Sequence, residues 1–430
     1  MEQIPASMNV LVIGSGGREH ALVHKIAASP LVETVYVSPG NPGTAGIATN
    51  VALSRLDGPT IAALARDKSI QLVVIGPEGP LADGLADDLR AHGIPVVGPG
   101  KAGAVLESSK AWSKEFMARH HIPTAAYRSF TAAELDSALA YVGAHSLPVV
   151  VKASGLAAGK GVVICSTTAE AEASVREMLS GAAFGEAGAE VVIEEFLTGI
   201  EVSVFVITDG KQAVRLPEAK DYKRIGEGDT GPNTGGMGAV SPVPFADAAF
   251  MAEVERSIIT PTIAGLRAEG IDYRGFIFFG LINVGGKPYV IEYNARMGDP
   301  ETEAVMPRID GDLVPVLAAC AAGDLSGHSL GVLPAHAVTV VVVSGGYPGS
   351  YPKGLPMTVG DWPGALYFHA GTAMTADGLV TQGGRVMAVT ALGQDLASAR
   401  DLAYAQVAEV NFQGRYFRRD IGLDLLAPGA

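Results

Sequence analysis

Three polar side chains at alternate positions, Glu292, Asn294 and Arg296, have the types and spacing most suited to chemistry. A strand alternates its faces, so a strand here would place the three on one face with Val290. The opposite face would be apolar and pack on a core: Ile291, Tyr293 and Ala295. A carboxylate and an amide oxygen two residues apart suit Mg²⁺, which takes one or two protein ligands and completes its shell with water and phosphate. The guanidinium beyond them would stabilise charge on a transferring phosphoryl group. A solvated edge strand with the same polar residues is the alternative.

A glycine-rich loop between two short strands is the next candidate. Strands are expected at 149–152 and 162–165, with GLAAGKG between them. The loop is not a P-loop, because Gly161 replaces the Ser or Thr that would hold Mg²⁺ and a strand rather than a helix follows. We interpret it as a flap over a triphosphate, in which Lys152 and Lys160 meet phosphate oxygens as point charges.

The strand that follows the flap ends in Glu194, Glu195, Phe196 and Leu197. Backbone groups at such a strand end can pair with the edge of an adenine, and Glu201 is placed for a ribose. A strand, turn and strand without a ligand would have the same pattern. Upstream, 101–123 is expected to be one amphipathic helical segment that contains Lys110 and ends at Pro123.

The beginning of the chain, MNVLVIGSGGREH, predicts a buried strand, a glycine turn and a helix, which is the first unit of a doubly wound sheet. A dinucleotide site is not favoured, because Glu19 occupies the place of the third glycine and the second strand ends in Ser38 and Pro39 rather than an acid. We expect free N–H groups at the turn to bind a smaller phosphate. The residues assigned to it are Gly16, Gly17, Arg18 and His20. The third strand ends at Gly76, Pro77 and Glu78, where open α/β sheets place ligands, and Glu78 could hold ribose hydroxyls.

The long segment 220–244 is predicted to be a binding loop, because it is rich in glycine and mixes Lys, Arg and Asp. It contains Asp221, Asn233, Thr234, Gly235 and Gly236. From about 334 to the end, strands followed by a helix form a third unit in which we recognise no catalytic constellation. His336 and His369 are interpreted as structural.

Composition sets the class of protein. A chain of 430 residues is expected to form more than one domain. The net charge of −14 and pI of about 5.1 argue against a general binder of nucleic acid or of anionic membranes. The two cysteines, Cys165 and Cys320, are expected to be buried free thiols. A signal peptide and a membrane span are not recognisable, so we expect a cytoplasmic protein that acts on small molecules, as a monomer or small homo-oligomer.

Four motifs together resemble the glycinamide ribonucleotide synthetases (phosphoribosylamine–glycine ligases) of the ATP-grasp superfamily. They are VLVIGSGGREHAL, KASGLAAGKGV, DTGPNTGGMGA and IEYNARMGDPET, and the resemblance runs essentially from end to end. The loop departs from the family where it reads KDYKR, since many members have Gln-Asp-His-Lys-Arg, but Asp221, Lys223 and Arg224 still align. The resemblance implies an α/β chain, α+β in parts. It implies an N-terminal doubly wound domain (1–107), an ATP-grasp domain (108–332) with a flap subdomain at about 124–197, and a β-rich C-terminal domain (333–430).

The resemblance also implies the reaction: ATP-dependent joining of glycine to 5-phosphoribosylamine through glycyl phosphate, in de novo purine synthesis, with ATP and Mg²⁺ (or Mn²⁺). Implied catalytic residues are Arg296, Lys160 and Asp221, and implied metal ligands are Glu292 and Asn294. ATP contacts are Lys110, Lys152, Gly155, Gly159, Lys160, Gly161, Glu194, Glu195, Phe196, Leu197 and Glu201. Substrate contacts are Gly16, Gly17, Arg18, His20, Gly76, Pro77, Glu78, Asp221, Asn233, Thr234, Gly235, Gly236, Arg296, Gly298, Asp299 and Pro300. Another ATP-grasp ligase or carboxylase, and a nucleotide-binding regulatory protein without chemistry, are the alternatives.

Overall fold

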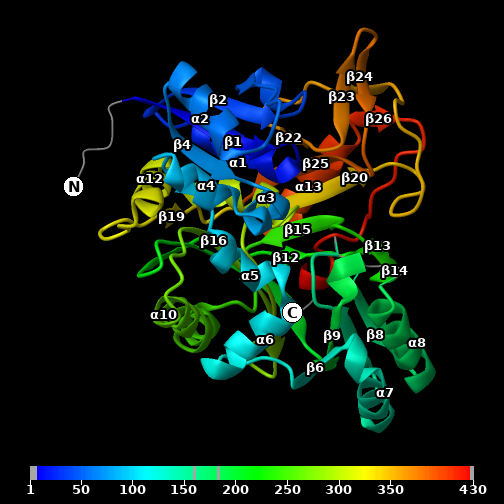
Figure 1. Ribbon diagram of the computed structural model, residues 1–430. Coiled ribbons are helices and arrows are strands. Elements are labelled where there is room, and N and C mark those ends of the chain that lie inside the picture. Colours follow the sequence, from blue (N-terminus) through cyan, green and yellow to red (C-terminus); the bar gives the residue numbers. More distant parts are fainter. Residues whose placement is uncertain (1–6, 158–160, 182–184, 427–430) are drawn as a thin grey trace.

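The computed structural model describes residues 7–157, 161–181 and 185–426. Its N-terminal part is a five-stranded parallel sheet in the order β3-β2-β1-β4-β5, at the upper left of Figure 1. The strands are β1 (Met8–Gly14), β2 (Val32–Pro39), β3 (Thr49–Asn50), β4 (Ile70–Ile75) and β5 (Val96–Val97). The helices are α1 (Gly17–Ala27), α2 (Gly58–Asp67), α3 (Glu78–Asp83) and α4 (Leu85–Ala91). In β1, Val10 and Val12 pack in one core with α1, while Leu11 and Ile13 pack in another with α2 and α4. The doubly wound prediction is confirmed.

An antiparallel sheet in the order β11-β10-β16-β17 follows along the chain. Its strands are β10 (Ile200–Thr208), β11 (Ala213–Arg215), β16 (Gly275–Val284) and β17 (Lys287–Asn294). The helical segments α9 (Ala248–Val254), a π-helical turn (Glu255–Ile259) and α10 (Thr260–Ala268) contribute to the core on one face. β16 and β17 form the predicted hairpin, joined at Gly285 and Gly286, which both have positive φ.

The expected alternation of faces in β17 is wrong at one position. Glu292 pairs with Gly280 while Val290 pairs with Leu281, so Ile291 is an extra residue, a β-bulge. The bulge shifts the alternation by one residue. Val290 therefore packs in the same core as Tyr293, and Ile291 turns to the polar side with Glu292.

The small sheet at the lower right of Figure 1 has the order β6-β9-β7-β8. Its strands are β6 (Tyr127–Thr131), β7 (Val149–Ala153), β8 (Val162–Cys165) and β9 (Glu190–Glu195), and α7 (Leu135–Ala144) and α8 (Thr168–Leu179) pack on it. β7 and β8 are antiparallel neighbours on either side of the glycine loop, as predicted.

A five-stranded sheet in the order β12-β15-β20-β25-β22 lies beside the N-terminal sheet (Figure 1). Its strands are β12 (Lys220–Asp221), β15 (Gly238–Ser241), β20 (His336–Val343), β22 (Leu366–His369) and β25 (Arg385–Gly393), and α13 (Leu396–Val407) packs on it. Two of these strands come from segment 220–244, which was expected to be a loop throughout. That segment therefore joins the middle of the chain to the C-terminal sheet.

Shorter elements complete the described chain. They are α5 (Lys101–Ser108), α6 (Lys110–Arg119), β13 (Arg224–Gly226), β14 (Thr230–Asn233), α11 (Glu301–Val305), β18 (Ile309–Asp310), α12 (Val314–Ala322), β19 (Gly331–Val332), β21 (Met357–Val359), β23 (Thr372–Thr375), β24 (Gly378–Thr381) and β26 (Val410–Phe412).

The helical segment expected over 101–123 is two helices rather than one. Ser109 has extended backbone and its hydroxyl accepts a hydrogen bond from the Trp112 N–H, so it ends α5 and caps α6. Because of this break, Lys110 becomes the first residue of α6. Its N–H donates to the Ser154 carbonyl, at the start of the glycine loop.

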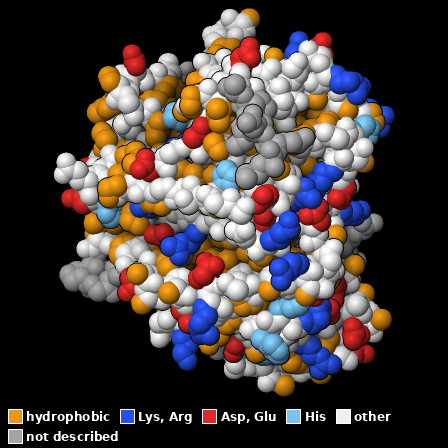
Figure 2. All heavy atoms as spheres, turned by 90° about the vertical axis from the view of Figure 1, so that its left-hand side faces the viewer, with side chains coloured by type: hydrophobic (Ala, Val, Ile, Leu, Met, Phe, Trp, Pro, Cys, Tyr) orange, Lys and Arg blue, Asp and Glu red, His pale blue; other side chains and the backbone are white. Residues whose placement is uncertain are grey.

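The surface and the thiols agree with a globular chain of mixed charge. On the face shown in Figure 2, acidic and basic side chains lie intermixed. Cys165 and Cys320 are free and buried, as predicted. Within the described ranges, no helix is both long and apolar enough to cross a membrane.

Candidate active site

A cavity of about 830 Å³ lies where the small sheet, the β16–β17 hairpin and segment 220–236 meet. Glu292 and Asn294 line it together with Lys110, Lys152 and Gly161. The predicted metal ligands and the lysine-bearing strand therefore face one space. Gly159 and Lys160 lie outside the described residues.

The remaining predicted site residues divide by position. Those that line the cavity are Arg18, Glu78, Glu194, Glu195, Phe196, Leu197, Glu201, Asp221, Asn233, Thr234, Gly235, Arg296, Gly298 and Asp299. Those that do not are Gly16, Gly17, His20, Gly76, Pro77, Gly155, Gly236 and Pro300.

One end of the cavity carries ammonium groups, here called the lysine cluster: Lys110, Lys114 and Lys152 around Glu194. The Nζ atoms of Lys152 and Lys114 lie 2.9 Å and 3.1 Å from the same oxygen, Glu194 Oε2. Lys110 Nζ donates instead to the Gly155 carbonyl at 3.0 Å. Burial lowers the pKa of Lys110, and it lowers the pKa of Lys114 to about 8 although Glu194 acts in the opposite direction. Two ammonium groups share one carboxylate oxygen and the third contacts a backbone carbonyl, so the ammonium groups of this cluster outnumber the carboxylates that they contact.

The other end carries guanidinium groups, here called the arginine cluster: Arg18, Arg296 and Arg385 with their carboxylates. Arg296 Nη2 lies 2.6 Å from Glu107 Oε1, and its Nε lies 3.4 Å from Glu78 Oε2. Burial alone would raise the pKa of Glu78, but Arg296 and Arg18 hold that pKa below its ordinary value. Each ion pair fixes the plane of a guanidinium, so this cluster is oriented before any ligand arrives.

Arg385 brings the C-terminal sheet into the site. Its Nη1 lies 3.1 Å from Asp299 Oδ1 and donates to the carbonyls of Gly235 and Asp299. The sequence reading recognised no catalytic constellation in that part of the chain. Arg385 belongs to no motif that we recognised in the sequence. Its place in the site depends on contact with Asp299, which is 86 residues away along the chain.

The glycine turn after β1 is not the open anion site that we expected. The Gly16 N–H donates to Glu19 Oε2 at 2.7 Å, and a Cβ on Gly76 would lie 2.3 Å from Glu19 Oε1, so the Glu19 side chain fills the turn. Nδ1 of His20 accepts the His369 N–H at 2.9 Å, and burial lowers the pKa of His20 to about 3. His20 is therefore neutral. Of the residues assigned to this turn, only Arg18 reaches the cavity.

Three family models match the chain in sequence order. They describe the phosphoribosylglycinamide synthetase N domain (residues 8–107), ATP-grasp (A) domain (108–302) and C domain (337–424). The chain belongs to the phosphoribosylglycinamide synthetase family. It is 48% identical to the phosphoribosylamine–glycine ligase of Vibrio cholerae, over 98% of this chain and 99% of that one. It is 49% identical to the ligase of Agrobacterium fabrum, with the same shares covered.

Solved structures agree with this membership. The phosphoribosylamine–glycine ligase of Thermotoga maritima has a TM-score of 0.85 at 35% identity, and the match covers 96% of this chain and 100% of that chain. The biotin carboxylase domain of the Hydrogenobacter thermophilus 2-oxoglutarate carboxylase has a TM-score of 0.72 at 17% identity, covering 99% of this chain and 100% of that one. The second likeness shows the fold alone. The predicted ATP-grasp fold and the predicted family are both confirmed.

The segment KDYKR, residues 220–224, lies beside the predicted metal-ligand pair. Lys223 Nζ lies 2.7 Å from Glu201 Oε2 and 3.7 Å from Asp221 Oδ2. Burial would lower the pKa of Lys223, but Asp221, Glu201 and Glu292 raise it well above its ordinary value. Glu201, which we expected to contact a ribose, instead forms an ion pair with Lys223. The sequence reading aligned Lys223 but gave it no role.

Glu292 and Asn294 fit a hard divalent cation. Both present oxygen atoms to the cavity, and neither side chain has a hydrogen bond or ion pair to another residue among those described. No cluster of three His, Cys, Asp or Glu residues suited to a metal occurs in the described part of the chain. Two protein oxygens with the rest of the shell open is the arrangement that Mg²⁺ uses with nucleotide phosphates.

Two buried acids at the arginine cluster were not recognised from the sequence. Burial and the nearby Asp221 raise the pKa of Glu301 to about 7. Burial and Asp299 raise the pKa of Glu303 well above its ordinary value. Both follow Asp299 in α11, and the family motif, which ends at Thr302, contains Glu301 but not Glu303; only the packing shows that carboxyl groups outnumber guanidiniums here.

Proposed function

We propose that this chain joins glycine to 5-phosphoribosylamine at the expense of ATP, giving glycinamide ribonucleotide, ADP and phosphate, an early step of purine synthesis. As a member of its family the chain is an ATP-dependent carbon–nitrogen ligase. The observation that carries the proposal is one cavity that holds the Glu292–Asn294 pair, Arg296 and the lysine cluster.

ATP lies with its phosphates at the lysine cluster. The protonated ammonium groups of Lys152 and Lys110 neutralise phosphate oxygens, and Glu194 holds Lys152 and Lys114 in place. The adenine edge meets the chain at Glu195–Leu197, where β9 ends. Glu292 and Asn294 would hold Mg²⁺ or Mn²⁺, which when bound would offset the negative charge of the ATP phosphates.

Arg296, at the arginine cluster, orients the reacting groups. A glycine carboxylate oxygen attacks the γ-phosphorus as the bond to the ADP oxygen breaks, and Arg296 stabilises the equatorial oxygens. The nitrogen of phosphoribosylamine then attacks the carbonyl carbon of glycyl phosphate. The carbon–oxygen bond to phosphate breaks and the nitrogen loses a proton. Asp221 or Asp299 pairs with the glycine ammonium.

The phosphate of phosphoribosylamine is assigned to Arg18 and Arg385. Both guanidiniums line the cavity and both interact with Asp299, Arg18 from helix α1 and Arg385 from strand β25. Because Glu19 fills the glycine turn, the cavity side of Arg18 is the part of that turn open to an anion. Asn233 and Thr234 lie on the same wall, and Glu78 is within reach of Arg18 for ribose hydroxyls.

A cytoplasmic setting and small-molecule substrates belong to the same proposal. Two buried free thiols suit a reducing compartment. The division into domains at 1–107, 108–332 and 333–430 remains our proposal as well, with segment 220–241 contributing two strands to the C-terminal sheet.

One assay tests the function: ADP release from ATP with glycine, with and without freshly made phosphoribosylamine. We expect turnover only when both co-substrates are present. Turnover that depends on bicarbonate instead would select a carboxylase, which the likeness to biotin carboxylase folds makes the relevant rival. ATP binding without turnover under any of these conditions would select a regulatory protein.

A further inference from the structure

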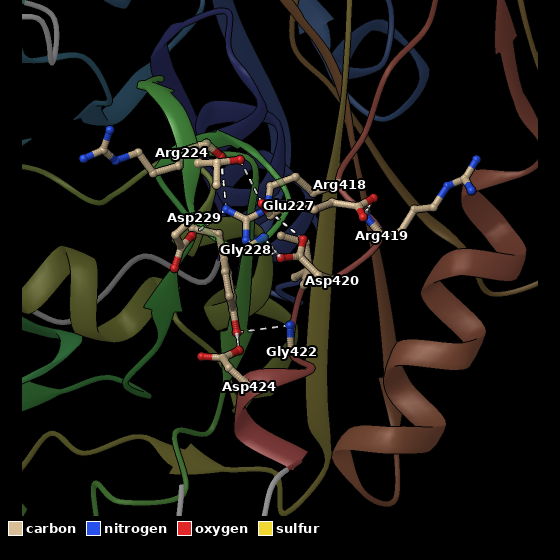
Figure 3. Close-up of polar contacts among 12 residues, drawn as sticks. Arg224, Glu227, Gly228, Asp229, Arg418, Arg419, Asp420, Gly422 and Asp424 are labelled. Atoms are coloured by element: carbon tan, nitrogen blue, oxygen red, sulfur yellow. Dashed lines mark hydrogen bonds and ion pairs between the residues drawn. The ribbon is translucent and has the colours of Figure 1, made fainter.

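A buried arginine, Arg418, follows the last strand of the chain, β26, and lies outside every motif recognised in the sequence. Arg418 is 1% exposed. Its Nε and Nη2 pair with the two oxygens of Asp420 at 2.8 Å and 2.7 Å. Its Nη1 donates to Asp229 Oδ1 at 2.7 Å and to the Arg224 carbonyl at 3.1 Å (Figure 3). A guanidinium buried to this degree is stable only with its donors paired, so Arg418 depends on the segment that Arg224 and Asp229 belong to.

That segment is the β13–β14 hairpin, residues 224–233, which cannot hold its own shape. Two-stranded ribbons are marginal by themselves. Its strands are three and four residues long, and Thr230, Gly231 and Pro232 are exposed. The turn places Asp229 at φ +53°, a left-handed conformation that a residue with a side chain adopts only when its surroundings hold it there. The hairpin therefore requires contacts from outside itself.

The C-terminal strap, residues 416–424, supplies them. Besides the contacts of Arg418, the Gly228 N–H donates to Asp420 Oδ2 at 2.8 Å and the Tyr416 hydroxyl donates to the Ile225 carbonyl at 3.0 Å. The Arg419 N–H donates to Glu227 Oε1 at 3.2 Å. Strap and hairpin meet at each turn residue, as Figure 3 shows.

The same hairpin is also a wall of the active-site cavity. Arg224, Asp229 and Asn233 line the cavity, and so does Asp424 from the end of the strap. Asp424 also holds the start of the loop, because Lys220 Nζ lies 2.9 Å from its Oδ2 and the Tyr222 hydroxyl donates to its Oδ1 at 2.5 Å. The strap thus contacts Lys220 and Tyr222, just before the β13–β14 hairpin, as well as the turn of the hairpin itself.

We propose that Arg418 is a positioning residue of the ligase: it fixes the β13–β14 hairpin so that Arg224 and Asn233 meet phosphoribosylamine at the right place. This rests on the proposed function. The ATP side lies at the lysine cluster on other elements, so ATP binding is independent of Arg418.

Arg418→Met tests the assignment, with Arg419→Met as the matched control. Arg419 is the next residue, exposed, and its side chain has no partner among the described residues and points away from the cluster in Figure 3. Because charge-assisted hydrogen bonds are lost, we expect Arg418→Met to raise KM for phosphoribosylamine about tenfold or more, with KM for ATP unchanged. Arg419→Met should match the wild type. Arg418→Lys keeps the positive charge but loses the paired donors of the guanidinium, so its KM for phosphoribosylamine should lie between those of the wild type and Arg418→Met. If Arg418→Met does not fold, Arg418→Lys is tested in its place.

A second readout needs no substrate. Amide exchange of residues 224–233 should speed up in the Arg418 variants and stay as in the wild type for Arg419→Met. Exchange and KM values equal to wild type would overturn the proposal, and so would equal loss for ATP and phosphoribosylamine, which indicates a general stability role. If the wild type lacks ligase activity, the proposed function fails, and exchange in the hairpin still decides whether Arg418 holds it.

Discussion

The two ends of the cavity pair their cations in different ways. At the lysine cluster, Lys114 and Lys152 share one oxygen of Glu194 and Lys110 donates to a backbone carbonyl, so ammonium groups outnumber the carboxylates they contact. At the arginine cluster the guanidiniums already pair with carboxylates, those of Glu78, Glu107 and Asp299. Two further acids beside them, Glu301 and Glu303, have raised pKa values that favour their neutral forms. The first arrangement suits the charge of a triphosphate, and the second suits recognition of direction, since paired guanidiniums are rigid.

The difference also concerns the kind of cation. A lysine ammonium is a compact charge on a flexible stem, and it serves where attraction is needed more than direction. A guanidinium presents donors in a fixed plane, and it serves where a transition state must be met at defined angles. Substitutions at the lysine cluster should therefore affect ATP affinity, and substitutions at the arginine cluster should affect kcat.

The largest effect is expected from Arg296→Lys. The lysine keeps the charge but loses the fork that pairs with Glu107 and Glu78, so stabilisation of the transferring phosphoryl group is lost. We expect kcat to fall about 10²–10³-fold. ATP affinity, measured by calorimetry, should stay near the wild-type value. Arg256→Lys is the control, since Arg256 is exposed and, among the residues that the structure describes, its side chain pairs only with Glu253. An unaltered kcat would remove Arg296 from the mechanism.

Lys152→Met should have the complementary effect. It removes one of the two ammonium groups on Glu194 and an attraction for phosphate, so ATP should bind about tenfold more weakly or worse. The exposed Lys353→Met serves as control. The measurement is a calorimetric titration with ATP in the presence of Mg²⁺. If Arg296→Lys weakened ATP binding as much as Lys152→Met does, the contrast between the two ends would be wrong.

The surplus of acid at the arginine cluster predicts a pH dependence of stability. The pKa of Glu301 rises from 4.5 to about 7 in the folded chain, chiefly because of burial and Asp221. Between about pH 4.5 and 7 the folded chain binds more protons at Glu301 than the unfolded chain does. Stability from this group therefore falls as the pH rises through that window, and the loss is complete above it.

Glu301→Gln removes this titration. Thermal unfolding without ligands should show the variant to be more stable than the wild type at pH 8, with the gap closing as the pH falls towards 4.5. If the difference in stability between variant and wild type does not change with pH, Glu301 is not the group whose titration lowers the stability of the folded chain.

Sequence reasoning found the parts of the site whose evidence is local. The hairpin that carries Glu292 and Asn294, and the two strands around the glycine loop, were predicted from alternation and turn residues within about twenty positions. It placed the lysine-bearing strand and the metal-ligand pair in one cavity, as the structure does. These features depend on residues that are close in sequence, so a sequence pattern can predict them.

The features that sequence reasoning missed depend on distant pairing. The bulge at Ile291 arises from the register with β16, and Arg385 acquires its place only through Asp299. β15 was missed because its partner strand, β20, lies about a hundred residues further along the chain, and β12 was missed with it because β12 pairs with β15. The glycine turn was misread for a related reason. Its own Glu19, a residue that also appears in the family motif, occupies the space that glycines leave.

The smallest effect on catalysis is expected at His20, and it tests the corrected reading of the arginine cluster. His20 is neutral and buried, and Nδ1 accepts the His369 N–H. His20→Asn can keep an acceptor near the same place and should leave KM for phosphoribosylamine unchanged. His20→Leu leaves a buried N–H unpaired, which should cost about 1–3 kcal/mol of stability, again without a change in that KM. The decisive measurement is KM for phosphoribosylamine between pH 6 and 8 in both variants. A rise in KM for His20→Asn would indicate that the substrate phosphate binds at the glycine turn, and the assignment to Arg18 and Arg385 would then be wrong.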